Sequence, residues 1–464
     1  MQSNTSKLFE RSIFIFRRDL RIHDNTALIR SLKESHTVIP CFIFDENQIN
    51  LQNNQFFSHN CVQFMIESLH DLNRQLSKHN SRLHFFCGDI ENTISHMISA
   101  IKPQALYLNE DVTPYSIKRD KIISSLCEKN NIKFFSFEEM MLHSKKQAML
   151  DNGFFYQMFT PYYKKVSVFP IHEPQENHYT NYISAKEEFP GEFSVKKIDD
   201  FYQYNPDIAV HGGRSEGLML LENLHNLKNY TEIRNIPSLS TSKLSAFNKF
   251  GCLSIREVYY KVREEMGEES ALAKQLYWRD FYYGVMYHYP HVLLKPMKKA
   301  YENLQWEDNK EHLERWGKGM TGCPIVDAGM RELNKTGFLT NRMRLIVANY
   351  LVKDLLINWQ EGEKYFGTKL VDYDVSQNNG SWQWVAGAGC DTQPYFRIFN
   401  PNLQSVKFDP DCEYIKKFVP ELKDVPKEHI HGWEDNYQLY EGKVDYPAPI
   451  VKHLEQKEKV VKMY

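Results

Sequence analysis

Apolar runs alternate with amphipathic stretches along the first third of this chain, and no other feature of the sequence limits the fold as strongly. Apolar runs with the length of buried strands occupy residues 12–16, 37–45, 82–89, 105–111 and 133–138. Apolar residues at helical spacing lie between them, at residues 26–35, 57–77, 91–101 and 115–130. Strands that alternate with helices predict a parallel sheet covered on both faces. We therefore expect residues 1–144 to form an α/β domain with a doubly wound, Rossmann-like sheet.

The rest of the chain has a different pattern. Residues 145–209 are rich in Pro, Glu, Tyr and Asn, which predicts an interdomain linker with one short helical piece at residues 157–165. From about Val210 strand patterns vanish and amphipathic helices continue to the end. We therefore expect residues 210–464 to form an all-α domain.

Composition and charge exclude several classes of protein. The formal net charge of the 464 residues is -2, so the whole molecule is not a polyanion binder and would meet nucleic acid only through a local basic patch. The eight Cys show no CxxC spacing, which favours reduced thiols and predicts no metal site. There is no apolar run of membrane length and no secretory signal, so we expect no membrane contact and an intracellular setting, cytoplasmic or nuclear depending on the source. The turn after the first strand, residues 17–25, lacks GxGxxG, which argues against a dinucleotide there.

The helical part carries a dense group of polar and aromatic residues between Asn341 and Trp384. Residues 341–359 predict one long buried helix, with Asn341, Arg344 and Leu345 on one face near its start. A buried Arg needs a partner, and Asp372 and Asp374 are the nearest carboxylates. Two amides and three Trp complete the group, which indicates a large, polar and aromatic ligand.

Two shorter groups precede it. Thr241, Ser242 and Ser245 surround Lys243 at an expected helix N-terminus, a combination that suits a phosphate, although a plain N-cap explains the hydroxyls as well. Residues 275, 278 and 279 place an amide, an indole and a guanidinium on one helix face, where a structural Trp is the alternative.

Seven segments together resemble the signatures of the photolyase/cryptochrome family, in order and at matching separations. They are RRDLRIHDN, TSKLSAFNKFG, WRDFYYG, TGCPIVDAGMREL, NRMRL, NNGSWQW and PYFRIFNP. The match covers essentially the whole chain and is closest to the class I cyclobutane pyrimidine dimer (CPD) DNA photolyases. This resemblance implies an α/β domain with a helical FAD domain, and a monomeric carbon–carbon lyase that repairs CPDs in damaged DNA by electron transfer from photoexcited, reduced FAD. The alternatives are a cryptochrome-type blue-light receptor without repair activity and a flavin- or nucleotide-binding module without photochemistry.

The resemblance also implies roles for individual residues. Asn378 would face the flavin N5, and the ion pair of Arg344 with Asp372 would lie beside the isoalloxazine. Arg279 and Asp374 would contact the cofactor. The FAD pyrophosphate would be held by Tyr230, Thr241, Ser242, Lys243, Leu244 and Ser245. Electrons would reach the flavin through Trp306 at the surface, Trp359, and Trp382 next to the ring.

The remaining residues carried over concern DNA. Trp278 and Trp384 would stack on a flipped-out dimer, and Gln275 and Asn341 would bond base edges. The residues expected to touch DNA around the lesion are Arg234, Arg342, Leu345 and Gln404.

The chain departs from the CPD photolyase pattern at three positions. Gln275 replaces a Glu, Phe338 a Trp and Leu345 a Met. The (6-4) photolyases also have Gln at this site, but Asn341 and Leu345 stand where their characteristic His residues would be, and Trp384 replaces the Tyr usual in DASH cryptochromes. These departures leave base preference and quantum yield open.

The second chromophore is also open. Folate-binding relatives carry Asn-Glu where this chain has Tyr115 and Ser116, so the folate site is not carried over, and a deazaflavin, another flavin or no antenna remain.

Overall fold

The computed structural model describes residues 7–392, 394 and 396–464, and its N-terminal part contains a parallel sheet. The strands pair in the order β3-β2-β1-β4-β5, and every pair is parallel. Their bounds are β1 Phe9–Phe16, β2 Ser35–Asp45, β3 His84–Gly88, β4 Ala105–Asn109 and β5 Lys133–Phe137. The predicted strands and the predicted fold class are confirmed.

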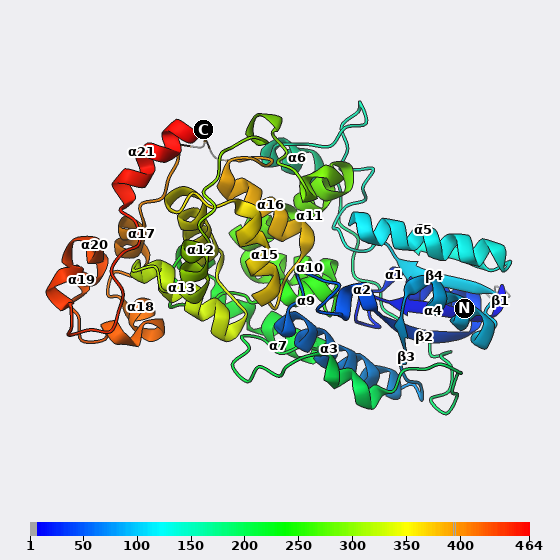
Figure 1. Cartoon of the computed structure of the whole chain (residues 1–464). Helices are drawn as coiled ribbons and strands as arrows, with labels where there is room; N and C mark the ends of the chain where they lie inside the picture. The colour runs from blue at the N-terminus through cyan, green and yellow to red at the C-terminus, as the bar shows by residue number, and fades with distance from the viewer. Residues whose placement is uncertain (1–6, 393, 395) are drawn as a thin grey trace.

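Helices cover both faces of this sheet, because successive strand residues point to opposite sides. Ile13 and Ile15 of β1 pack in one apolar cluster with α4 and α5, whereas Phe14 and Phe16 pack in another with α1 and α3. The helices of this part are α1 Thr26–Glu34, α2 Glu46–Ile49, α3 His59–Ser77, α4 Ile90–Ile101 and α5 Pro114–Lys129. Figure 1 shows this part as the blue and cyan half of the molecule.

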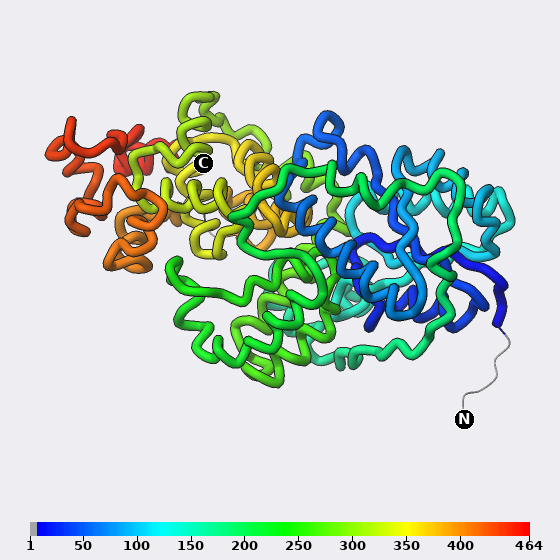
Figure 2. The backbone as a smooth tube through the Cα atoms, turned by 90° about the horizontal axis from the view of Figure 1, so that it is seen from below, coloured from blue at the N-terminus to red at the C-terminus, as the bar shows by residue number. Residues whose placement is uncertain are grey.

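The segment after β5 runs back over the α/β part as an extended chain. Figure 2 shows it, coloured teal to green, lying along the blue and cyan elements. It is hydrogen-bonded to β2, since Val38 N donates to Asn181 O at 3.0 Å and Ile183 N donates to Val38 O at 2.9 Å. It contains the short helix α6 Phe159–Val166, as expected, and a 3-10 helix, η1 Val195–Phe201. The exact domain bounds stay a prediction.

The second half is helical, and no strand follows β5 in the part of the chain that the structure describes. Figure 1 shows these helices in green to red. Those that come first are α7 Arg214–Glu222, α8 Tyr230–Ile233, α9 Ser245–Phe250, α10 Ile255–Met266, α11 Ala271–His288, α12 Lys310–Lys318, α13 Pro324–Thr336, α14 Asn341–Asn349, α15 Trp359–Lys369 and α16 Val375–Ala386. The last ones are α17 Pro401–Phe408, α18 Glu413–Phe418, α19 Lys427–His431, α20 Trp433–Asn436 and α21 His453–Met463. Short 3-10 turns are η2 Asn223–Leu227, η3 Pro290–Leu293, η4 Lys299–Tyr301, η6 Pro420–Leu422 and η7 Tyr437–Tyr440.

The expectation of one long helix over residues 341–359 is wrong. The α-helix ends at Asn349 and a π-helical turn, η5 Tyr350–Asp354, follows it. Leu356 then adopts a left-handed backbone with φ of 56°, and Asn358 caps α15 by accepting from Gln360 N at 3.1 Å. The apolar spacing continues through the break because both segments are buried in the same cluster, so the pattern recorded burial and not helical continuity.

Three further observations concern membranes, metals and thiols. Over the described residues, none of the helices combines the length and the apolar character that crossing a bilayer requires. In the same residues, no three or more His, Cys, Asp or Glu side chains are grouped so as to hold a metal ion. The cysteines are free thiols.

Candidate functional site

A cavity of about 520 Å³ lies inside the helical part, between α8–α11 on one side and α14–α16 on the other. Helices that are distant in sequence bring most of the predicted site residues to its walls. The predicted cofactor residues that line it are Tyr230, Thr241, Ser242, Lys243, Leu244, Ser245, Arg279, Arg344, Asp372, Asp374 and Asn378. The predicted substrate and relay residues that line it are Arg234, Gln275, Trp278, Asn341, Leu345, Trp382 and Trp384. Trp306, Trp359, Arg342 and Gln404 lie outside this lining.

The ion pair expected from the sequence is present in the lining of the cavity. Arg344 Nη2 lies 2.7 Å from Asp372 Oδ2, and Arg344 Nε donates to Leu339 O at 2.9 Å. The second carboxylate oxygen, Asp372 Oδ1, is buried and has no hydrogen-bond partner among the described residues. A buried acceptor without a donor is costly, so this oxygen is suited to a ligand N–H.

Asp374 connects the cavity to the α/β part. Its Oδ1 caps α16 by accepting from Ser376 N at 3.0 Å and Gln377 N at 3.1 Å, and its Oδ2 is bound by Tyr283 and by Arg18, which follows β1. Burial alone would raise the pKa of Asp374, but the Arg18 guanidinium and these donors hold it below its usual value. Arg18 was not among the predicted site residues, although the RRDLRIHDN segment contains it.

The hydroxyl-rich segment before α9 also lines the cavity. Lys243 has a left-handed backbone, with φ of 51°, and α9 begins two residues later. No side chain caps α9, so the N-cap alternative for Thr241, Ser242 and Ser245 is not what the structure shows. Hydroxyls and an ammonium therefore line the cavity here, as a phosphate group requires.

Asn378 faces the cavity from α16 and is held from behind. Its Nδ2 donates to Glu363 O at 2.9 Å, and the next residue, Asn379, donates from Nδ2 to Glu363 Oε1 at 2.9 Å. Burial raises the pKa of Glu363 to about 7, because the Asn379 amide compensates only part of the lost hydration. Sequence reasoning missed Glu363, which lies fifteen residues before Asn378 and belongs to no recognised motif.

The three Trp of the predicted relay differ in burial. Trp382 lines the cavity and is 2% exposed, Trp359 is buried in the same core, and Trp306 is half-buried. Trp382 packs edge-on against Phe366 at 4.9 Å and Trp316 at 6.2 Å, measured between ring centroids. The relay and its order from Trp306 to Trp382 stay a prediction.

Aromatic and amide side chains surround the cavity mouth. Trp278 stacks on Phe159, with centroids 3.8 Å apart and an angle of 7°. Gln275 and Trp384 line the cavity nearby, and Asn341 is exposed at the start of α14. The three departures from the family pattern all line this cavity; they are Gln275, Phe338 and Leu345. A change of substrate preference would therefore arise from contacts inside the cavity.

Arg342 and Gln404 lie beyond the lining on neighbouring helices. The Arg342 guanidinium is 4.4 Å from the Phe408 ring centroid, which places α14 against α17, and Arg342 Nη2 donates to Asn235 Oδ1 at 3.0 Å. Gln404, also on α17, has a buried Oε1 without a partner in the described part of the chain. Tyr395 of the PYFRIFNP segment lies outside the described residues.

Comparisons with known proteins give one consistent result. A family profile described as "FAD binding domain of DNA photolyase" matches residues 272–464, and one described as "DNA photolyase" matches residues 12–177. A deoxyribodipyrimidine photo-lyase of Alkalihalophilus pseudofirmus is 33% identical over 97% of this chain and 96% of its own length. The solved structure of an archaeal photolyase from Sulfolobus tokodaii with two FAD molecules has a TM-score of 0.88 at 41% identity, covering 98% and 99% of the two chains. A bacterial class III photolyase from Agrobacterium tumefaciens has a TM-score of 0.89 at 30% identity, covering 100% and 99%.

Proposed function

The chain belongs to the DNA photolyase family, and from that premise we propose that the cavity in its helical part binds FAD and a cyclobutane pyrimidine dimer flipped out of DNA. It is a photolyase, a light-driven carbon–carbon lyase with FAD as its cofactor. The assignment to the CPD class and the residue roles below are the proposal. The observation that carries it is the cavity, whose lining brings together the hydroxyl-rich segment, the Arg344–Asp372 pair and the indoles of Trp278, Trp382 and Trp384.

Two groups of cavity residues fit FAD. Lys243 and the hydroxyls of Thr241, Ser242 and Ser245 would hold the pyrophosphate, and Tyr230 and Leu244 would border it. The unpartnered Asp372 Oδ1 would accept an N–H of the flavin ring, and the adjacent Arg344 would favour negative charge on it. Bound FAD supplies the photoexcited electron donor of the reaction.

The remaining wall residues orient the ring and admit electrons. Asn378, held by the Glu363 carbonyl, would present its amide to the flavin without rotating. Trp382, Trp359 and Trp306 would conduct electrons inward from the surface, in that spatial order from the cavity outward. An oxidisable ring in the wall of the cavity is the necessary last member of such a path.

The mouth would hold the damaged bases. Trp278 and Trp384 offer flat faces for stacking, and Gln275 and Asn341 offer amides to base edges. Burial, and to a smaller degree the neighbouring Arg234, lower the pKa of Arg342. Both guanidinium groups would face the DNA phosphates beside Leu345 and Gln404. We infer that the protein is a monomer and that it acts on DNA inside the cell.

A second chromophore of the flavin type fits the carboxyl ends of β1 and β4. Arg17 Nε and Nη2 and Arg119 Nε are buried without hydrogen-bond partners within the described residues, and the nearest carboxylate oxygen to Arg119 Nε is Asp120 Oδ1 at 3.5 Å. Burial and the neighbouring Arg17 lower the pKa of Arg119 to about 10, so an electron-rich ring with carbonyl oxygens would relieve both groups. The Sulfolobus tokodaii relative was solved with two FAD molecules, and we infer the same chemical class here. Two flavins per purified chain is the expected stoichiometry, and one flavin with a folate spectrum would contradict it.

Illumination of the reduced protein with a dimer-containing oligonucleotide tests the function. We expect thymines to be restored in the light and not in the dark. Trp278→Ala should weaken dimer binding while FAD photoreduction continues, because Trp278 belongs to the mouth. Photoreduction with unchanged dimers would instead identify a cryptochrome-type receptor and overturn the repair proposal.

A further inference from the structure

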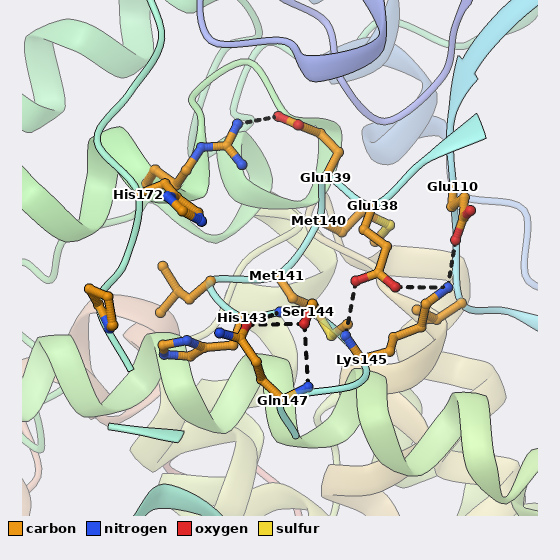
Figure 3. Close-up of a pocket in the computed structure, with 14 residues that line it drawn as sticks. Glu110, Glu138, Glu139, Met140, Met141, His143, Ser144, Lys145, Gln147 and His172 are labelled. Carbon is orange, nitrogen blue, oxygen red and sulfur yellow. Dashed lines mark hydrogen bonds and ion pairs between the residues drawn. The ribbon is translucent and has the colours of Figure 1, made fainter. Parts of the chain in front are cut away.

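A second cavity, of about 450 Å³, lies beyond the carboxyl ends of β4 and β5. Glu110 follows β4, residues 138–147 follow β5, and Arg256 of α10 with residues 170–172 complete the lining (Figure 3). Open parallel sheets bind ligands in this position, and the volume is that of an ordinary small-molecule site. None of the predicted site residues lies here.

His143 is the unexplained group of this cavity. Its side chain lines the cavity and is 4% exposed, yet neither ring nitrogen has a hydrogen-bond partner in the described part of the chain. The ring packs on Tyr277 at 5.9 Å with an angle of 29°. Burial and the nearby His172 lower the pKa of His143 to about 4, so one nitrogen donates and the other accepts at neutral pH. Two buried polar atoms without partners indicate a missing ligand.

The cationic side chains around His143 are already paired, which disfavours an anionic ligand in this cavity. Lys145 Nζ lies 2.5 Å from Glu110 Oε2, as the dashed line in Figure 3 shows. Arg256 is bound to Asp24 and to Glu139, each at 2.9 Å. Both of these cations are therefore already paired, and a phosphate would find no free positive partner in them.

One carboxylate in the lining can accept a further hydrogen bond. Glu138 is 39% exposed; its Oε2 accepts from Lys145 N at 2.9 Å, and its Oε1 is 3.7 Å from Lys145 Nζ. Two thioethers, Met140 and Met141, give the cavity soft apolar surface against which a flat ring can lie. The combination is a neutral donor–acceptor pair, an acceptor carboxylate and apolar faces.

We propose that this cavity binds an uncharged, amino-substituted purine base or its nucleoside. One ring nitrogen of His143 bonds a polar atom on the edge of the base, while Glu138 accepts from the exocyclic amino group. The ligand touches residues 140–142, whose backbone is bonded to α11: Arg279 Nη1 donates to Met140 O at 2.6 Å, and Leu142 N donates to Asp280 Oδ2 at 2.6 Å. The site does not depend on the proposed repair chemistry.

Titration calorimetry of the FAD-loaded protein with adenosine tests the proposal. We expect saturable binding of adenosine and weaker binding of inosine, which lacks the amino group. His143→Phe keeps the aromatic packing and removes both nitrogens, so it should weaken adenosine binding roughly tenfold or more. Its FAD content and photoreduction should match the wild type, which separates this site from the proposed function.

Two further variants keep the test decisive. Glu138→Gln alters a surface-exposed carboxylate, cannot compromise the core, and should reduce the preference for adenosine over inosine. Glu188→Gln, at an exposed position outside the cavity, is the matched control and should change nothing. Absence of adenosine binding at millimolar concentration, or wild-type binding in both His143→Phe and Glu138→Gln, overturns the proposal. Loss of binding in Gln275→Ala with none in His143→Phe would place the base at the FAD cavity and overturn it as well.

Discussion

The two cavities are linked by the hydrogen bond from Arg279, which lines the larger one, to the Met140 carbonyl in the smaller one, but they differ in which polar groups are left without partners. In the larger cavity, Asp372 is ion-paired with Arg344 through one oxygen, and its other oxygen is buried without a hydrogen-bond donor in the described part of the chain. Lys243 lines the same cavity before α9, a helix that no side chain caps. In the smaller cavity, Lys145 and Arg256 are paired within the protein and a neutral imidazole is left open. A carboxylate with a free acceptor oxygen and a lining ammonium suit a charged cofactor such as FAD, whereas paired charges around a neutral imidazole suit an uncharged base. The difference shows that the state of pairing, and not the number of charged residues, indicates the ligand class.

The largest expected effect breaks the charged pair of the larger cavity. Asp372→Ala leaves the Arg344 guanidinium without its carboxylate, at a cost of about 3–5 kcal/mol for a buried pair. We expect loss of bound FAD, measured by absorbance after gel filtration, while adenosine binding to the smaller cavity persists. Asp372→Asn, which keeps the shape and an acceptor oxygen, should lose less FAD. Full FAD occupancy in Asp372→Ala would show that the pair does not hold the cofactor.

The second effect concerns two buried carboxylates beside the same helix, α16. Arg18 holds the pKa of Asp374 low, whereas Glu363 has only an amide partner and burial raises its pKa from 4.5 to about 7. The native state therefore binds more protons at Glu363 than the unfolded state does between about pH 4.5 and 7. Stability is lost as the pH rises through this window, by about 3 kcal/mol for a shift of this size.

Glu363→Gln removes this dependence and keeps the acceptor for Asn379. We expect the free energy of unfolding in urea to favour the variant over the wild type more at pH 8 than at pH 5. Glu361→Gln, at an exposed position on the same helix, is the control and should show no such gain. Parallel pH profiles of wild type and Glu363→Gln would contradict the raised pKa.

A third, smaller effect tests how tightly the walls are packed. A Cβ placed on Gly362 would lie 2.2 Å from the Trp382 ring, so Gly362→Ala must displace that indole. We expect a loss of about 1–3 kcal/mol and slower FAD photoreduction. Met141→Leu in the softer wall of the smaller cavity should cost less than about 1.5 kcal/mol. Equal losses of unfolding free energy in the two variants would remove this contrast between the walls.

Much of the fold could be predicted because its pattern is local. Strands inside a doubly covered sheet are buried on both faces and appear in the sequence as continuous apolar runs, which is why the inner strands β1, β2 and β4 could be predicted. The edge strand β5 is only partly buried, and its aromatic residues made it recognisable. The same signal misled over residues 341–359, since apolar spacing reports burial and does not register a π-helical turn or the left-handed Leu356. Hydrogen-bond geometry at such a break depends on the whole core.

The sites could be predicted only in part. The FAD residues came from a resemblance across seven segments, while spacing alone left each group with a structural alternative. The Arg18–Asp374 ion pair joins residues 356 positions apart, and nothing local to either residue indicates the other. His143 lies in an ordinary loop sequence, and only its burial without partners marks it.

The smallest expected effect in free energy tests whether the larger cavity alone has an electron path. Trp359→Phe keeps an aromatic ring in the core but removes the more easily oxidised indole. We expect FAD photoreduction to slow about tenfold or more, equivalent to about 1.4 kcal/mol, with FAD content unchanged. Trp433→Phe, in the same apolar cluster but packed on Tyr440 and Tyr446, is the matched control and should photoreduce normally. Transient absorption after a blue flash measures the photoreduction rate of both variants. An unchanged rate in Trp359→Phe would mean that electrons reach Trp382 by another route. Trp316, whose ring centroid is 6.2 Å from that of Trp382, would then be the first residue to substitute.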